Sequence, residues 1–212
     1  MRRRSTSLVL TVLLILAAAP RVRAQDRSSA QSIPAGYGTL NQDDIAVRIR
    51  TDDVELRLIP LDERVLRLLA TDAYTSLRSL MAAKRPSIDS VASQSGVTRP
   101  GLALVSFFGQ RADARFDPQI VTIGIRNRVF RPLGIVPLSA SFSSQQLGVR
   151  VQASGIYIFE EEIPVTEPFS VGYGTFTAND WERRLSTLDR ERQRIASRAR
   201  AGGPSDSTVS RR

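Results

Sequence analysis

Residues 45–58 read IAVRIRTDDVELRL, and apolar and polar side chains alternate on both sides of a polar centre. The apolar positions are Ile45, Val47, Ile49, Val54, Leu56 and Leu58. A period of two is typical of strands that bury one face, because successive side chains point to opposite sides. The polar residues 50–53 between the two runs favour a tight turn. We therefore predict a β-hairpin over this stretch.

Residues 61–95 are predicted to form a small helical insert, because the apolar spacing changes to three and four. The apolar residues with this spacing are Val65, Leu66, Leu68, Leu69, Tyr74, Leu77, Leu80 and Met81. We expect helices over 61–70 and 72–84, and we expect Pro86 to stop the second one, since proline lacks the amide donor. A third short helix is expected over 87–95.

Strand patterns return after residue 101. Residues 102–108 are apolar on both faces, as in a central strand. Further strands are predicted at 120–125, 129–137, 147–159 and 169–175. Asn127 is a plausible turn position between two of them, and Gly155 suggests a bulge or bend in a long strand.

The order of these elements predicts the fold class. Five or more strands, with turn signals about every ten residues, favour an α+β protein over an alternating βαβ layout. We expect an antiparallel β-sandwich, immunoglobulin-like or related, with the helical insert on one side. It should form a single β-rich domain over residues 43–200, after a flexible linker at 25–42 that is rich in small and polar residues.

A C-terminal helix is predicted over residues 178–200, with Asn179 as its cap. Its apolar residues fall at heptad-like spacing and form the candidate partner-binding stripe Trp181, Leu185, Leu188 and Ile195. The stripe must be buried on the protein's own sheet, on a second subunit or envelope protein, or on an anionic membrane surface. The opposite face carries Arg183, Arg184, Arg190, Arg194 and Arg198. Residues 201–212 are expected to be a disordered tail.

The N-terminal segment has the order of a secretion signal. Three arginines precede an apolar run over 8–19, which is followed by Pro20 and small or aliphatic residues before Ala24 and Gln25. We predict cleavage between Ala24 and Gln25, by either the general or the twin-arginine export route. The apolar run is shorter than the roughly 20 residues that a membrane span needs. The mature chain is therefore expected to be periplasmic or extracellular, with no transmembrane segment.

The composition excludes several chemistries. The 212 residues include no cysteine and no histidine. This excludes disulfides, thiolate nucleophiles, sulfur-ligated metals, Ser-His-Asp triads and imidazole bases. No stretch carries a cofactor motif. We therefore expect a non-enzymatic protein without cofactor or metal.

The net charge of +9 is concentrated at the two ends of the chain. Residues 1–24 carry +5, residues 181–212 carry +5, and the long stretch between them carries −1. A near-neutral body without interleaved aromatic residues does not favour nucleic-acid binding. The basic C-terminal helix is the one region whose charge differs from the rest.

Four arginines form the candidate anion-binding set, namely Arg126, Arg128, Arg131 and Arg150. The first three cluster around a predicted turn, and Arg150 is expected on a neighbouring strand. Their guanidinium groups could bind a phosphate or carboxylate of an anionic glycan or lipid headgroup. The acidic run 160–162 is interpreted as a solvated strand end, since neighbouring residues in a strand point to opposite faces. The pairs at 43–44 and 52–53 lack the spacing of a calcium loop.

Two functions remain open. The first is a non-enzymatic binding or assembly module of a bacterial-type cell envelope. The alternative is a carboxylate-dependent glycan hydrolase, because that chemistry needs neither cysteine nor histidine. The alternative requires two carboxylates across one cleft, roughly 5–9 Å apart.

Overall fold

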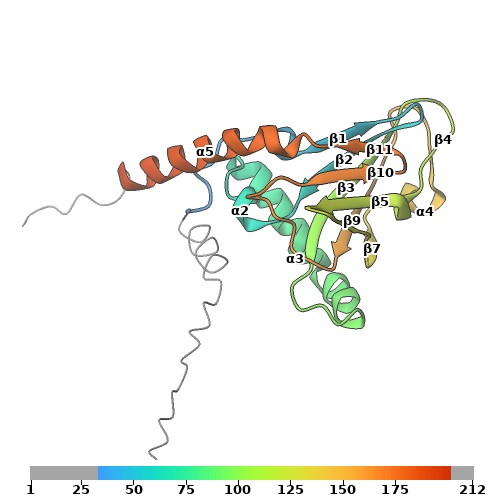
Figure 1. The fold of residues 1–212 in the computed structure, drawn as a ribbon, viewed down its shortest axis with the longest axis horizontal. Helices are drawn as coiled ribbons and strands as arrows, with labels where there is room; N and C mark the ends of the chain where they lie inside the picture. The colour runs from blue at the N-terminus through green and yellow to red at the C-terminus, as the bar shows by residue number, and fades with distance from the viewer. Residues whose placement is uncertain (1–32, 202–212) are drawn as a thin grey trace, which may run out of the picture.

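The structure, a computed structural model, describes residues 33–201 (Figure 1). The predicted signal peptide, its cleavage site at Ala24 and Gln25, the first part of the predicted linker and the tail from Gly202 lie outside these residues. The protein is α+β, with antiparallel sheets and a C-terminal helix, as predicted. The immunoglobulin-like sandwich remains a prediction.

The largest sheet has five antiparallel strands and contains the predicted hairpin. Its order is β1 (Val47–Arg50), β2 (Val54–Pro60), β3 (Gly101–Gly109), β9 (Gln152–Phe159) and β7 (Gly134–Pro137). Val47 pairs with Leu58 and Arg50 with Glu55, so the predicted hairpin is confirmed. β3 is the central strand of the sheet, as its two apolar faces predicted.

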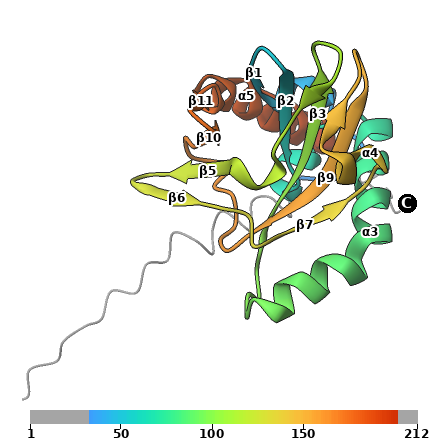
Figure 2. The same ribbon diagram turned by 90° about the vertical axis from the view of Figure 1, so that its right-hand side faces the viewer.

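A second sheet has four antiparallel strands, and a third has two. The four-stranded order is β11 (Phe176–Ala178), β10 (Ser170–Tyr173), β5 (Val121–Ile125) and β6 (Arg128–Phe130), and the short pair is β4 (Ala114–Arg115) with β8 (Gln146–Leu147). Asn127 lies in the turn between β5 and β6, as predicted. This hairpin projects from the body (Figure 2).

Two of the predicted strands are interrupted. The segment 129–137 divides into β6 and β7, which belong to different sheets; Pro132 lies between them and has no amide to donate. The segment 147–159 is broken at 148–151, because the Val151 amide donates to the Gly148 carbonyl across a tight turn at 3.1 Å. β9 then runs through Gly155 with an unbroken register against β3, so it has no bulge there.

The helical insert differs from the prediction at Pro86. The structure has a short α2 (Glu63–Leu66) and one long α3 (Thr71–Gln94), with Pro86 inside it. Proline in a helix interior removes one backbone hydrogen bond and kinks the helix, and Figure 2 shows α3 bending. Leu77 before the proline and Ile88 after it are both buried, so packing holds the two halves in one helix.

The core side of the large sheet packs against the second sheet through aromatic rings. Phe107 of β3 stacks on Phe116 with ring centroids 4.4 Å apart and lies 5.7 Å from the ring of Tyr173 on β10. Tyr157 of β9 donates its buried hydroxyl to the Pro118 carbonyl at 3.0 Å, and burial raises the pKa of this phenol. The remaining short elements are η1 (Gln42–Ile45), η2 (Pro118–Ile120) and α4 (Ser141–Ser144).

The C-terminal helix α5 (Trp181–Ala201) packs on the protein's own body. Trp181, Leu188 and Ile195 are buried, and Leu185 is half-buried against the same core. The Trp181 indole donates to the Val165 carbonyl at 3.3 Å. The stripe is therefore buried against this chain's own core, and the Trp181 indole bonds to a loop residue rather than to a strand of the sheet. A partner could reach the three fully buried side chains, of Trp181, Leu188 and Ile195, only if α5 left the body.

The linker prediction needs correction over residues 33–42, which lie against the body. The Leu40 amide donates to the Leu68 carbonyl, and the Ala70 amide donates to the Leu40 carbonyl. Glu191 of α5 is 1% exposed, and its Oε1 accepts hydrogen bonds from the Thr39 amide at 2.9 Å and hydroxyl at 2.8 Å. Among residues 33–201, no helix is long and apolar enough to cross a membrane.

Candidate functional site

The outer face of the large sheet is covered over only part of its area. Leu102 lies on this face of β3, and it lines a cleft together with Ile88 of α3. Four residues further along the same face, Ser106 pairs in register with Arg57 of β2, which pairs in turn with Arg48 of β1. The outer face therefore becomes polar toward the end of the sheet that carries the β1–β2 turn.

An open groove lies on this polar half of the face and encloses about 550 Å³. We call it the arginine groove, and its lining residues are Arg48, Glu55, Arg57, Phe108, Gly109, Gln110, Val149 and Arg150. Three guanidinium groups and one carboxylate line it. The carboxylate, of Glu55, is already paired with Arg50 at 2.6 Å and lies 3.8 Å from Arg48. The groove thus has an excess of positive charge.

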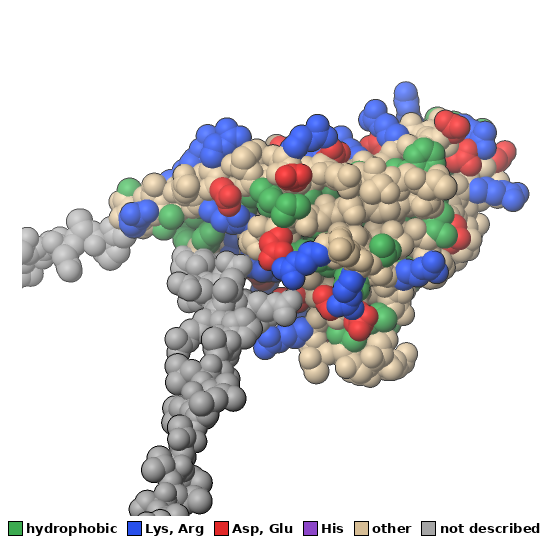
Figure 3. Space-filling model, in the orientation of Figure 1, with side chains coloured by type: hydrophobic (Ala, Val, Ile, Leu, Met, Phe, Trp, Pro, Cys, Tyr) green, Lys and Arg blue, Asp and Glu red, His purple; other side chains and the backbone are tan. Residues whose placement is uncertain are grey.

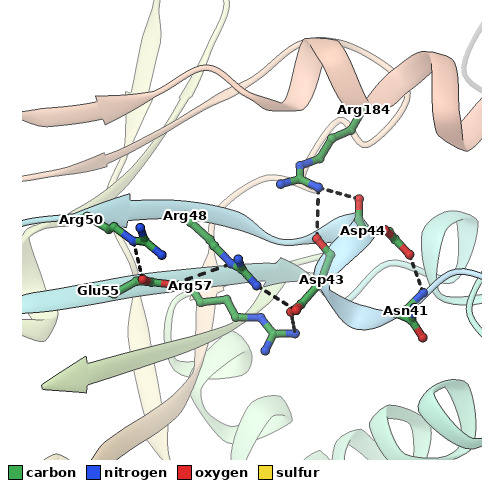
Figure 4. A network of polar contacts seen from close by, with 8 residues as sticks. All are labelled: Asn41, Asp43, Asp44, Arg48, Arg50, Glu55, Arg57 and Arg184. Carbon is green, nitrogen blue, oxygen red and sulfur yellow. Dashed lines mark hydrogen bonds and ion pairs between the residues drawn. The ribbon is translucent and has the colours of Figure 1, made fainter. Parts of the chain in front are cut away.

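Arg48 and Arg57 converge on a single carboxylate, that of Asp43 in η1 (Figure 4). The Arg48 Nη2 lies 2.9 Å from one Asp43 oxygen, and the Arg57 Nη2 lies 2.8 Å from the other. Burial alone would raise the pKa of Asp43, but the Arg48 hydrogen bond and the charges of Arg57, Arg48 and Arg184 outweigh it and lower the pKa. The two guanidiniums are therefore oriented to hold a planar anion between them.

Arg57 has unused hydrogen-bonding capacity. Its Nε is buried and has no hydrogen-bond partner, and burial lowers the pKa of its guanidinium despite the attraction of Asp43. A buried donor without an acceptor costs about 1–3 kcal/mol. An acceptor that reached this nitrogen from the groove would recover part of that cost.

Arg184 of α5 ties this network to the C-terminal helix. It donates from Nη1 to the backbone carbonyls of Asp43 at 3.1 Å and Asp44 at 2.8 Å (Figure 4). The Asp44 carboxylate in turn accepts a hydrogen bond from the backbone amide of Asn41 at 2.7 Å. α5 thus helps to position the segment that carries Asp43.

The far wall of the groove is the turn 148–151, which is fixed to the end of β3. The Arg150 amide donates to the Gly109 carbonyl at 2.9 Å, and the Gly109 amide donates to the Val151 carbonyl at 3.0 Å. Arg150 has a φ of 61°, in the left-handed region that favours glycine. Non-glycine residues at such angles are strained and occur often at functional sites.

The four arginines of the predicted anion site are not all in one place. Arg126 pairs with Glu167 at 2.9 Å, and Arg128 pairs with Glu161 at 2.7 Å and lies over the Phe130 ring. These two, with exposed Arg131, belong to the β5–β6 hairpin and the residues after it. Arg150 instead lines the arginine groove.

Sequence reasoning missed Arg48 and Arg57 as partners of Arg150. The predicted turn at 50–53 would have paired position 48 with position 55, whereas the structure turns one residue later and pairs Arg48 with Arg57. No local signal relates either of them to Arg150. Their proximity depends on the pairing of β2 with β3 and on the turn 148–151.

A hydroxyl cluster lies next to the groove. The Ser106 and Ser154 hydroxyl oxygens are 2.9 Å apart, and the Gln152 amide donates to both, at 3.0 and 2.7 Å. Ser106 is buried. These hydroxyls are therefore occupied with one another, and they shape the polar floor beside Arg57.

A second cleft lies between α3 and the start of β3 and encloses about 810 Å³. Its lining includes two carboxylates from different parts of the chain, Asp89 of α3 and Glu162 of the loop after β9. Asp89 is ion-paired with Arg85 at 2.9 Å. Because the glycan hydrolase alternative requires two carboxylates in one cleft, this cleft is its candidate active site.

The acidic pairs at 43–44 and 52–53, for which no cation site was predicted, each have a carboxylate paired with arginine. Asp43 pairs with Arg48 and Arg57, and Asp53 pairs with Arg111 at 2.5 Å. Within the described part of the chain, no three side chains of the metal-binding types are grouped so that they could hold an ion. No family model, curated protein or solved structure matches this chain.

The lowered pKa of Asp43 predicts a pH dependence of stability. A carboxyl whose pKa is depressed on folding contributes stability above its unfolded pKa, here 3.8, and loses it as the pH falls through the folded pKa. Between pH 5 and pH 3, the free energy of unfolding should fall more steeply for the wild type than for Asp43→Asn. Urea denaturation at both pH values measures this. Equal slopes for the two proteins would contradict the assignment.

Proposed function

We propose that this chain is an exported, non-enzymatic binding module of a bacterial-type cell envelope, and that its arginine groove takes an anionic group. The observation that carries the proposal is the convergence of Arg48, Arg57 and Arg150 on one open groove with a single, already paired carboxylate. Charge-assisted hydrogen bonds from guanidinium to carboxylate or phosphate are roughly twice as strong as neutral ones. Asp43 already occupies such a position between two of the arginines.

The other lining residues indicate which chemical features the ligand has besides its anionic group. Phe108 and Val149 supply an apolar surface beside the guanidiniums, and Val149 is 55% exposed. A ligand that carries an anionic group beside an apolar face would use both. A carboxylate or phosphate on an envelope glycan or lipid headgroup has this chemistry.

Arg150→Gly is the sharpest test of the groove. It removes a guanidinium at a backbone position that glycine adopts without strain, so the fold should keep its stability or gain up to about 1 kcal/mol. Affinity for an anionic ligand should fall about tenfold or more, because a hydrogen bond to a charged group contributes about 1.5–3 kcal/mol. Calorimetric titration with inorganic phosphate, galacturonic acid oligomers and dispersed short-chain phosphatidylglycerol measures this.

Gln145→Gly is the matched control. Gln145 also has a left-handed φ, 52°, but it does not line the groove. It should change stability in the same direction and leave affinity unchanged. If none of the three ligands binds the wild type, or if both glycine variants bind equally well, the groove is not an anion site.

The location outside the cytoplasm is part of this proposal and rests on the N-terminal sequence. The expected result is a secreted product whose first residue is Gln25, determined by N-terminal sequencing after expression in a bacterial host. An intact N-terminus on protein retained in the cytoplasm would contradict it.

We also propose that the two larger sheets form an antiparallel β-sandwich, immunoglobulin-like or related. The supporting observation is the contact of Phe107 with Tyr173, which come from different sheets. An experimental structure in which these rings are apart would contradict it.

The second candidate function is a glycan hydrolase that uses the cleft between α3 and β3. It is supported by the two carboxylates, of Asp89 and Glu162, that line this cleft. Purified protein would then release reducing ends from envelope polysaccharide, and Asp89→Asn and Glu162→Gln would each abolish the release. Turnover that survives both substitutions would exclude this cleft.

A further inference from the structure

The exposed face of α5 carries a row of arginines that the groove does not use. Residues seven and four positions apart lie on the same side of a helix, and Arg183, Arg190 and Arg194 share the side opposite buried Trp181 and Leu188. Arg198 flanks them near the C-terminal end. We call these four residues the α5 arginine row. Figure 3 shows basic side chains along the upper edge of α5.

Carboxylates of the described residues neutralise only part of this row. Arg183 pairs with Asp180, and Arg194 lies 3.4 Å from Glu191. Glu191 is buried, and its carboxylate already accepts hydrogen bonds from the Thr39 amide and hydroxyl. It therefore compensates the charge of Arg194 only in part. α5 as a whole has seven arginines against three acidic residues.

Arg190 and Arg198 have neutral partners. Arg190 donates to the Ser186 carbonyl at 3.3 Å, and Arg198 donates to the Tyr37 carbonyl at 3.0 Å. In the part of the chain from 33 to 201, no carboxylate lies within ion-pair distance of either guanidinium. The middle and end of the row therefore have uncompensated charge.

The surface between the arginines is shallow, and all the residues that line it have polar or charged side chains. Arg190, Arg194 and Arg198 line an open depression of about 450 Å³ together with Gln193 and Ser197. None of these five residues has an aromatic ring on which a sugar could stack. None has a large aliphatic side chain that could insert into lipid. With 21 residues, α5 is about 30 Å long, and it extends from the body along one side (Figure 1).

We propose that the α5 arginine row binds the phosphate headgroups of an anionic membrane surface. A long, exposed, basic helix face without apolar anchors can contact many headgroups at once while lying on the surface. Each arginine near such a surface contributes about fivefold to binding, and the attraction decreases within a Debye length. The site is independent of the arginine groove, so either can fail without the other.

Vesicle sedimentation of the exported chain tests the proposal. The wild type should bind vesicles of phosphatidylglycerol and phosphatidylethanolamine and should not bind phosphatidylcholine vesicles. It should be released by 0.5 M NaCl, where the Debye length is only about 4 Å. The triple variant Arg183→Gln, Arg190→Gln and Arg194→Gln should bind about 100-fold more weakly. Wild type and variant have the same N-terminus, so any contribution from it cancels.

The matched control removes the same charge elsewhere. Arg126→Gln, Arg128→Gln and Arg131→Gln alter exposed arginines on and after the β5–β6 hairpin, and this variant should bind vesicles as the wild type does. Urea denaturation confirms that both variants are folded. Equal weakening by both variants would show that binding follows net charge alone and would overturn the proposal. Unchanged vesicle binding by the α5 variant would also overturn the proposal. So would a wild-type protein that binds galacturonic acid polymers but does not bind anionic vesicles.

Discussion

Trp181→Ala is expected to lower the free energy of unfolding by about 3–5 kcal/mol, the range for a large aromatic side chain removed from a core. Trp181 is completely buried at the start of α5 and lies 4.8 Å, centroid to centroid, from the ring of Phe169. Alanine would leave a cavity at the point where the helix joins the body and would remove the hydrogen bond to the Val165 carbonyl. Urea denaturation measures the loss.

Phe176→Ala is the control for this prediction. Phe176 is also aromatic and lies five residues earlier on β11, but it is 49% exposed. Its removal should cost well under about 2 kcal/mol, since little buried area is lost. A small effect of Trp181→Ala, comparable to that of Phe176→Ala, would mean that α5 is only loosely docked, and its apolar stripe would again be a candidate partner surface.

Gly109→Ala is expected to cost about 3 kcal/mol, at the upper end of the range for overpacking, and to impair the arginine groove. A Cβ at this position would lie 2.2 Å from the Gly148 carbonyl oxygen. That oxygen belongs to the backbone of the turn 148–151, so the clash cannot be relieved by a side-chain rotation. The turn must move away from β3 and take Arg150 with it. Urea denaturation and ligand titration report the two effects.

Gly148→Ala is the partner variant on the other side of the same contact. Its Cβ would lie 3.4 Å from a methyl group of Val151, which is ordinary contact. Both stability and anion affinity should therefore stay close to wild type. If Gly109→Ala behaves in the same way as Gly148→Ala, the turn is not fixed against β3 as described.

Sequence reasoning succeeded where a local pattern reports directly on burial. The alternation around residues 45–58 predicted a hairpin because one face of each strand is buried. β1 alternates buried with exposed residues, and β2 alternates buried with half-buried residues up to Leu58. The apolar stripe of the C-terminal helix predicted burial, and its residues are buried or half-buried. In both cases the period of the side chains is a property of a single element.

Sequence reasoning failed where tertiary contacts outweigh a local preference. Pro86 lowers the propensity of α3, but buried residues on both sides of it keep the helix continuous. The turn at 148–151 interrupts an alternating segment, because its hydrogen bonds go to Gly109 and within the turn itself. A local pattern contains no information about either contact.

The candidate site was likewise predicted only in part from the sequence. Arg150 was identified by residue type, but it was grouped with Arg126, Arg128 and Arg131 because it was expected on a strand next to their turn. In the structure, Arg126 and Arg128 pair with acidic residues instead. The neighbours of Arg150 come from β1 and β2, about 100 residues earlier in the chain.

The amino-acid sequence by itself determined the β1–β2 hairpin, the amphipathic helix and the separation of charge between a neutral body and a basic C-terminal end, because each depends on residues close together in the chain. The tertiary structure decided which side chains meet. Register across β1, β2 and β3 aligns Arg48, Arg57 and Ser106, and two backbone hydrogen bonds to Gly109 bring Arg150 to the same groove. A binding site of this kind depends on strand pairing between distant segments, and only the folded chain specifies that pairing.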